Sequence, residues 1–140
     1  MNDFKKSFIS SVKPLYKALP IIVGVILLIS LVSTLIPKSV YSSVFRGNIF
    51  VDSIVAAILG SVFMGNPATS YIIGGEFLNL GISLVAVTSF LIAWVTVGVV
   101  QLPAEMLMLG KKFAIVRNLL SFLFSTLSAI TIVLLLGILK

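Results

Sequence analysis

Long uncharged runs constrain this chain more than any other feature of its sequence. Residues 18–36, 83–100 and 119–139 contain 19, 18 and 21 residues without one charged side chain. A helix of the first length measures about 28 Å at ~1.5 Å per residue, which nearly matches a bilayer hydrocarbon core of ~30 Å. The sequence therefore predicts three transmembrane helices in an all-α integral membrane protein.

The composition agrees with membrane burial and argues against several other protein classes. The chain is 59% hydrophobic and 10% charged, whereas soluble domains carry roughly 25% charged residues. The net charge of +6 comes from short basic clusters beside the apolar runs, which is typical of topology signals rather than of nucleic-acid binding. The chain has no Cys and no His, so thiolate ligands, imidazole ligands and Ser–His catalysis are absent. We expect no enzymatic activity, metal, cofactor or nucleic-acid partner.

Residues 1–17 form a basic segment before the first uncharged run. Four lysines accompany Phe4, Phe8 and Val12, which recur every four residues and so share one helical face. This spacing favours an amphipathic helix in the membrane interface, with a frayed basic tail as the alternative. We therefore divide the chain into this segment and one transmembrane domain, residues 18–140.

A polar, Gly-containing break at residues 65–70 divides the stretch between the first two runs. The apolar piece before it, 49–64, has about 16 residues, and the piece after it, 70–80, has about 11. The second piece is too short to cross ~30 Å as a helix. Broken backbone at membrane depth is tolerated where it packs in protein or lines a watery cavity. The segment 49–80 therefore predicts a re-entrant helical hairpin, with four spans as the alternative.

The basic residues separate these two topologies. With a cytoplasmic N-terminus, the hairpin leaves seven Lys and Arg residues inside and three outside, whereas a crossing at 49–64 leaves five on each side. Because cytoplasmic loops carry the excess of basic residues, the hairpin is favoured. We expect a multi-pass protein with its N-terminus in the cytoplasm.

Small residues recur at helical spacing in two of the apolar segments. Such stripes let helix backbones approach closely in a membrane, so we expect helices to pack along them. The residues are Ser53, Ala56, Ala57, Gly60 and Ser61 in the first segment, and Ser121, Ser125 and Ala129 in the last run.

The break itself is the first candidate site. Pro67 cannot donate to a helical hydrogen bond, and it biases Asn66 away from helical geometry. The freed carbonyls, together with the side chains of Asn66, Thr69 and Ser70, are suited to a cation or a polar solute. Alternatively, Thr69 or Ser70 caps the second helical arm and the turn binds nothing.

Acidic residues beside the apolar segments supply further candidates. A carboxylate at the depth of Glu76 costs at least a few kcal/mol unless it is paired, hydrated or protonated, which suggests proton coupling or cation binding. A position at the headgroup level is the alternative for Glu76. Gln101 and Glu105 bracket Pro103 and mark either a second kinked polar site or an interfacial cap. We expect Asp52 to be interfacial.

Three stretches carry a resemblance to a known family. Residues 65–71, 74–76 and 94–105 together resemble the predicted-permease family that includes the organoarsenical efflux permeases, and the match covers about residues 60–118. The resemblance implies a prokaryotic inner-membrane protein built from two related halves, of which this chain is one. The positions that it carries over are Asn66, Pro67, Thr69, Glu76, Gln101, Pro103 and Glu105.

The half length implies a partner, either a second copy of the chain or a separately encoded second half. The absence of Cys argues against an arsenical substrate, since trivalent arsenic prefers thiol ligands. We therefore predict a permease half that moves a small solute or ion through a dimeric pathway lined by residues 66–70 and Glu76. The alternative is a membrane assembly subunit in which the break is dry and tightly packed.

Overall fold

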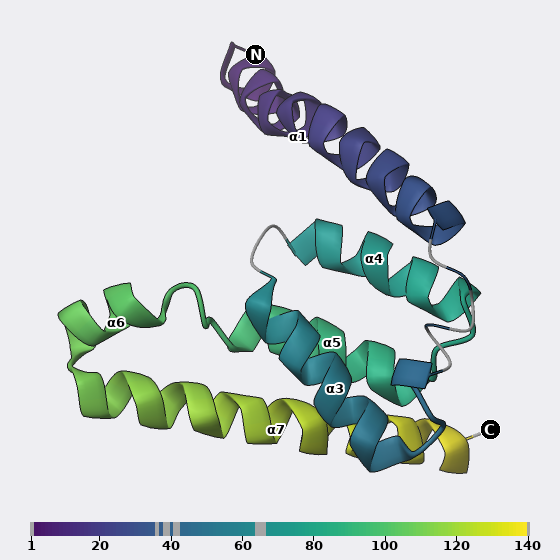
Figure 1. The fold of residues 1–140 in the computed structure, drawn as a ribbon. Helices are drawn as coiled ribbons and strands as arrows, with labels where there is room; N and C mark the ends of the chain where they lie inside the picture. The colour runs from purple at the N-terminus through teal and green to yellow at the C-terminus, as the bar shows by residue number, and fades with distance from the viewer. Residues whose placement is uncertain (1, 36, 38–39, 41–42, 64–66, 140) are drawn as a thin grey trace. The chain divides into compact units, whose positions relative to one another are not determined.

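All regular structure in the described part of the chain is helical. The structure is a computed structural model, and it describes residues 2–35, 37, 40, 43–63 and 67–139. The helices follow one another along the chain as shown in Figure 1. They are α1 (Asn2–Leu35), α3 (Ile49–Val62), α4 (Pro67–Asn79), α5 (Leu84–Thr96), α6 (Leu102–Leu109) and α7 (Lys111–Ile138).

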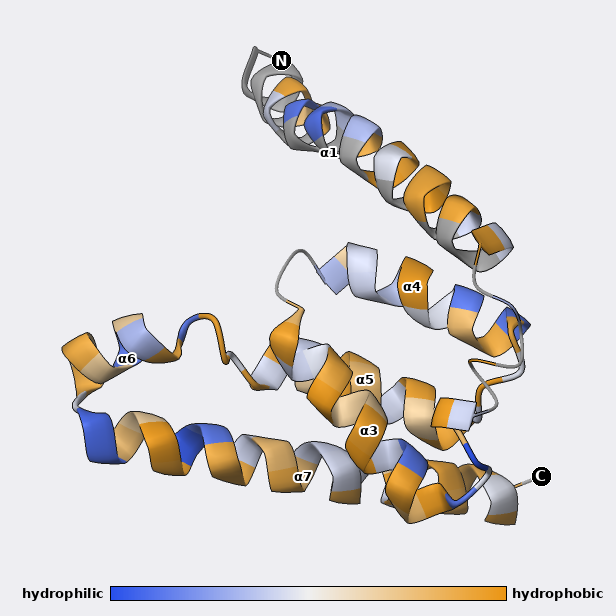
Figure 2. Ribbon diagram, in the orientation of Figure 1, coloured by the Kyte–Doolittle hydropathy of each residue, from blue (hydrophilic) through white to orange (hydrophobic). Residues whose placement is uncertain are grey.

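The chain divides into two compact units, residues 1–36 and 37–140, and α1 belongs to the first. This helix runs without interruption from Asn2 to Leu35. Residues 2–17 of the predicted amphipathic segment and the described part of the first uncharged run are therefore one continuous helix. Figure 2 shows its change from hydrophilic to hydrophobic residues. Val23, Leu27 and Leu31 are exposed along its apolar part.

Helix α5 is the centre of the second unit. Helices α3, α4 and α7 all pack against it, α3 also contacts α7, and α6 packs on α7. The core contains an aromatic row in which Phe77 meets Phe90 edge to face at 5.2 Å, and Phe90 lies 5.4 Å from Trp94 between ring centroids. Such pairs add to the stabilisation from apolar burial.

The predicted packing of small residues is confirmed within the chain. Ser53, Ala57 and Gly60 of α3 are buried, and a Cβ atom on Gly60 would lie 2.4 Å from the Phe90 carbonyl oxygen. The Ser89 hydroxyl donates to the Ser53 carbonyl at 2.8 Å. The backbones of α3 and α5 therefore touch, which only small side chains permit. On α7, Ser125 and Ala129 of the predicted stripe are buried, whereas Ser121 is half-buried.

The start of α3 is fixed by two polar side chains. Asn48 is the N-cap, and its side-chain oxygen accepts hydrogen bonds from the Phe50 and Val51 amides. The buried Asp52 carboxylate accepts from the Arg46 amide at 3.0 Å and the Gly47 amide at 2.9 Å. These bonds offset the cost of burying the Asp52 charge. Asp52 thus holds the turn before α3.

Helix lengths differ from the uncharged runs. Among the helices described, α7 alone is long and apolar enough to cross a membrane by length and composition. Helices α3 and α5 have 14 and 13 residues, or about 20 Å each at ~1.5 Å per residue. The fold class is confirmed as all-helical, whereas three transmembrane helices with a re-entrant hairpin remain a prediction.

Candidate functional site

Three of the predicted site residues meet at one cavity. Pro67 begins α4, Gln101 precedes α6, and Glu105 lies within α6, yet all three line a cavity of about 220 Å³. The other lining residues come from the end of α5, the segment after it and α7. They are Trp94, Val95, Thr96, Val97, Gly98 and Arg117.

The cavity lies where α5 stops. Val97 has extended backbone, with φ −105° and ψ 114°, and its amide still donates to the Ala93 carbonyl at 2.8 Å. The next amide, of Gly98, donates instead to the Asn118 side-chain oxygen at 2.9 Å. A Cβ atom on Gly98 would lie 2.9 Å from the Gln101 side-chain oxygen. Because Gly98 has no Cβ atom, the Gln101 side chain can lie against the end of α5.

An ion pair with a third partner forms the polar wall of the cavity. The Arg117 guanidinium donates to both Glu105 oxygens, with Nε 3.1 Å from Oε2 and Nη2 bonded to Oε1. Asn118 Nδ2 also donates to Glu105 Oε2, at 2.9 Å. The Glu105 side chain is 16% exposed and that of Arg117 38%. A bidentate pair of this kind fixes geometry and cancels charge. It joins α6 to α7.

Arg117 and Asn118 were missed as site residues by the sequence interpretation. The sequence predicts the last apolar span at residues 119–139, after both residues, whereas α7 begins at Lys111 and includes them. The available signal was an arginine and an amide 12 and 13 residues after Glu105, at the edge of an otherwise uncharged run. A charge there needs a partner.

The side chains of Thr69 and Ser70, which follow the break, are not among those that line this cavity. Ser70 is buried and donates to the Pro67 carbonyl at 2.7 Å, and Thr69 is half-buried. Because α4 begins at Pro67, both lie inside its first turn, so the predicted capping of this helix by Thr69 or Ser70 is wrong. Proline is tolerated at the first helical position because its missing N–H would be unpaired there anyway. Asn66 lies outside the described residues.

Glu76 lies apart from the other candidates. It follows Pro67 by nine residues on α4, which is about 14 Å along the axis at ~1.5 Å per residue. The side chain is half-buried and, in the described part of the chain, has no hydrogen-bond or ion-pair partner. Glu76 is not among the residues that line the cavity, whereas Pro67 of the predicted pathway and Gln101 and Glu105 of the predicted second site are.

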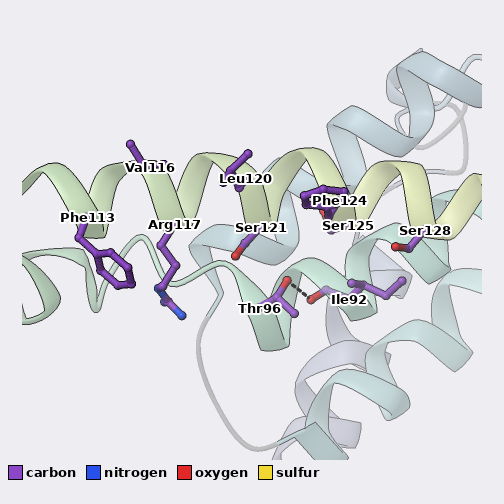
Figure 3. A pocket seen from close by; sticks show the side chains of 10 residues that line it. All are labelled: Ile92, Thr96, Phe113, Val116, Arg117, Leu120, Ser121, Phe124, Ser125 and Ser128. Atoms are coloured by element: carbon purple, nitrogen blue, oxygen red, sulfur yellow. Dashed lines mark hydrogen bonds between the residues drawn. The ribbon is translucent and has the colours of Figure 1, made fainter. Parts of the chain in front are cut away.

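A larger apolar groove of about 450 Å³ lies between α5 and α7 (Figure 3). Phe113, Arg117 and Ser121 project from α7 toward the side where Ile92 and Thr96 of α5 lie. Thr96 and Arg117 line this groove and also the smaller cavity, so the two hollows are neighbours. The rest of the lining is Val116, Leu120, Phe124, Ser125 and Ser128.

The donor set and the comparisons with known proteins complete the description of the site. In the described ranges, no three Asp, Glu, His or Cys side chains gather as a metal site would require. The polar side chains that line the cavity are the Glu105–Arg117 ion pair, the Gln101 amide and the Thr96 hydroxyl, and Asn118 donates to Glu105. No protein-family profile, curated protein or solved structure matches this chain.

Proposed function

We propose that the chain is a multi-pass inner-membrane protein and one half of a dimeric permease for a small solute. The observation that carries this proposal is the polar cavity formed where α4 begins and α5 ends, lined by Pro67, Gln101 and Glu105. Transporters characteristically place solute sites at such helix interruptions. The motifs around residues 65–76 and 94–105, which resemble permeases, include the same three residues.

The exposed apolar surface supports a membrane location. Large hydrophobic side chains are exposed along α7, including Phe124, Leu127, Leu134 and Leu135, and Figure 2 shows hydrophobic residues along much of this helix. Soluble monomers rarely expose contiguous apolar patches beyond a few hundred Å². Lipid or a second membrane chain would cover this surface. A second copy of the chain or a separately encoded half is the partner that would complete the pathway.

The cavity chemistry favours a small polar solute that is uncharged or zwitterionic. Its volume of about 220 Å³ corresponds to roughly seven water molecules at ~30 Å³ each. The Glu105–Arg117 pair leaves the wall without a net charge, so a bare ion would gain little there. The Gln101 amide offers both donors and an acceptor.

Water access tests the proposal, and the absence of native Cys makes the test clean. Gln101→Cys and the control Leu134→Cys are made one at a time and treated with a charged, membrane-impermeant thiol reagent. Both positions are exposed in the chain, but only Gln101 lines the polar cavity. We expect Gln101→Cys to react and Leu134→Cys, facing lipid, to remain unlabelled. An unreactive Gln101→Cys in open cells and in detergent would contradict a watery cavity.

An assembly subunit is the second candidate, and one observation favours it. The Glu105 carboxylate already accepts three hydrogen bonds, from Arg117 and Asn118. Polar groups so fully paired are suited to a dry structural contact between α6 and α7. On this alternative, Gln101→Cys stays unlabelled while the chain still inserts in the membrane.

A further inference from the structure

The groove between α5 and α7 is long and apolar. Along α7 it extends from Phe113 to Ser128, about 22 Å at ~1.5 Å per residue. One leaflet of a bilayer contributes about 15 Å, half of the ~30 Å hydrocarbon core. The groove is thus long enough to hold an acyl chain through the depth of one leaflet.

One end of this groove is basic. Phe113 and Val116 line both the groove and a neighbouring hollow of about 540 Å³, which is also lined by Lys111 and Lys112. Both lysines are exposed at the start of α7. In the described part of the chain, neither lysine is paired with a carboxylate, since the ion pair seen there joins Arg117 to Glu105. Two free cations therefore adjoin an apolar channel.

We propose that this surface binds an anionic phospholipid, with an acyl chain along the α5–α7 groove and the phosphate at Lys111 and Lys112. The inference rests on the membrane location in the proposed function. Charge decides between a lipid and a second copy of the chain as the occupant. The chain carries ten basic and four acidic residues, so a second copy would bring more positive than negative charge toward the lysines. An anionic headgroup complements them.

The headgroup contact is tested by lipid binding to the full chain purified in a nonionic detergent. Phosphatidylglycerol and phosphatidylcholine with identical acyl chains are titrated separately, and bound lipid is counted by native mass spectrometry. We expect tighter binding of phosphatidylglycerol. The variant Lys111→Gln/Lys112→Gln loses about 30-fold in that affinity, since each basic residue near a lipid surface contributes about fivefold. The control Lys13→Gln/Lys17→Gln removes the same charge from α1 and keeps the preference.

The acyl contact is tested by filling the groove. Ser128 lines it, whereas Leu127, its neighbour on α7, is exposed and does not. Ser128→Phe weakens binding of both lipids, and Leu127→Phe leaves it unchanged. A cooperative melt of each lipid-free variant checks that both fold.

Three results would overturn the proposal. They are equal affinity of the native chain for the two lipids, an undiminished preference in the double lysine variant, and disulfide cross-linking of Ser128→Cys between copies that added lipid does not suppress. The last result would place a second copy in the groove. The assay counts lipid rather than reagent access, so its failure leaves the water-accessibility test of the permease proposal standing. A dry Gln101→Cys likewise leaves lipid binding standing.

Discussion

At the scale of single residues, the role of Glu105 follows from its hydrogen-bond partners rather than from how deep it lies in the membrane. The sequence offered two interpretations of this acid, a polar site beside Pro103 or an interfacial cap. The structure supplies Arg117 and Asn118, which reach it from α7. Asn118 also accepts from the Gly98 amide. The Glu105 carboxylate therefore links α6 to α7 directly, and through Asn118 it also links both helices to the end of α5, at the wall of the cavity.

Removing the Glu105 charge should loosen this junction. We expect Glu105→Gln to lower the free energy of unfolding by about 1–2 kcal/mol, because a charged group is left without its partner. The figure is below that for a fully buried pair, since Arg117 is 38% exposed and partly screened by solvent. Unfolding of the detergent-solubilised chain by titrated SDS, followed by circular dichroism, measures the change.

A double-mutant cycle separates the pair from other effects. If the two residues act through each other, Glu105→Gln/Arg117→Gln loses less stability than the two single changes added together. Additive losses would show that the pair contributes little. Glu76→Gln is the matched control, since Glu76 has no ion-pair partner in the described part of the chain, and its unfolding should shift by less than about 0.5 kcal/mol.

Glu76 has a separate prediction for transport. The sequence suggests proton coupling or cation binding for this acid, and its half-buried side chain has no hydrogen-bond or ion-pair partner in the described part of the chain. We expect Glu76→Gln to insert and fold as the native chain does while abolishing proton-coupled flux. The measurement is acidification of proteoliposomes that contain a trapped pH-sensitive dye. Proton movement in the variant equal to that of the native chain would remove Glu76 from the mechanism.

At the scale of helices, the sequence patterns predicted a close helix contact better than they predicted where the helices begin and end. The spacing of Ser53, Ala57 and Gly60 correctly placed a close helix contact on α3. The end of α5 was not predictable, because the Gly98 amide leaves the helix to bond Asn118, 20 residues away. The start of α7 was missed because the uncharged run begins after Arg117, whereas the helix begins at Lys111 and Arg117 pairs with Glu105. Such ends depend on tertiary partners.

The contact between α3 and α5 gives a sharp packing test. A methyl group on Gly60 would lie 2.4 Å from the Phe90 carbonyl oxygen and 3.2 Å from the Ala93 Cβ atom. Because backbone must move to accept it, Gly60→Ala should cost about 1–3 kcal/mol of stability. The same SDS titration measures it.

Gly75→Ala is the control for this packing test. It adds the same methyl group inside helix α4, where nothing lies within 4 Å of the new atom. That change should be neutral or stabilising by up to about 1 kcal/mol, since Ala favours helix over Gly. Equal stability of Gly60→Ala and the native chain would mean that the two backbones do not touch in the membrane.

At the scale of the whole molecule, the candidate site was predictable in part. The motifs pointed to Pro67, Gln101 and Glu105, which do meet at one cavity. The sequence grouped Pro67 with Glu76 and gave Gln101 and Glu105 as a second site, whereas Glu76 lies farther along α4. The grouping depends on α4 packing against α5, and one sequence carries no local signal for that contact. Arg117 likewise reaches the cavity through a contact between helices, here α6 and α7.

The number of membrane crossings is the remaining whole-molecule prediction. Helix length does not decide it, because α4 and α5 have 13 residues each, so the prediction that α3 and α4 enter and leave on one side rests on the basic residues. That arrangement gives three crossings and places seven basic residues on the cytoplasmic side against three outside. Asn2→Cys and Leu139→Cys, each alone in the cysteine-free chain, should therefore label from opposite sides of intact inner-membrane vesicles. Labelling of both from the same side would mean four crossings, with α3 passing through the bilayer. The cavity at Gln101 and Glu105 would then connect to the other face of the membrane.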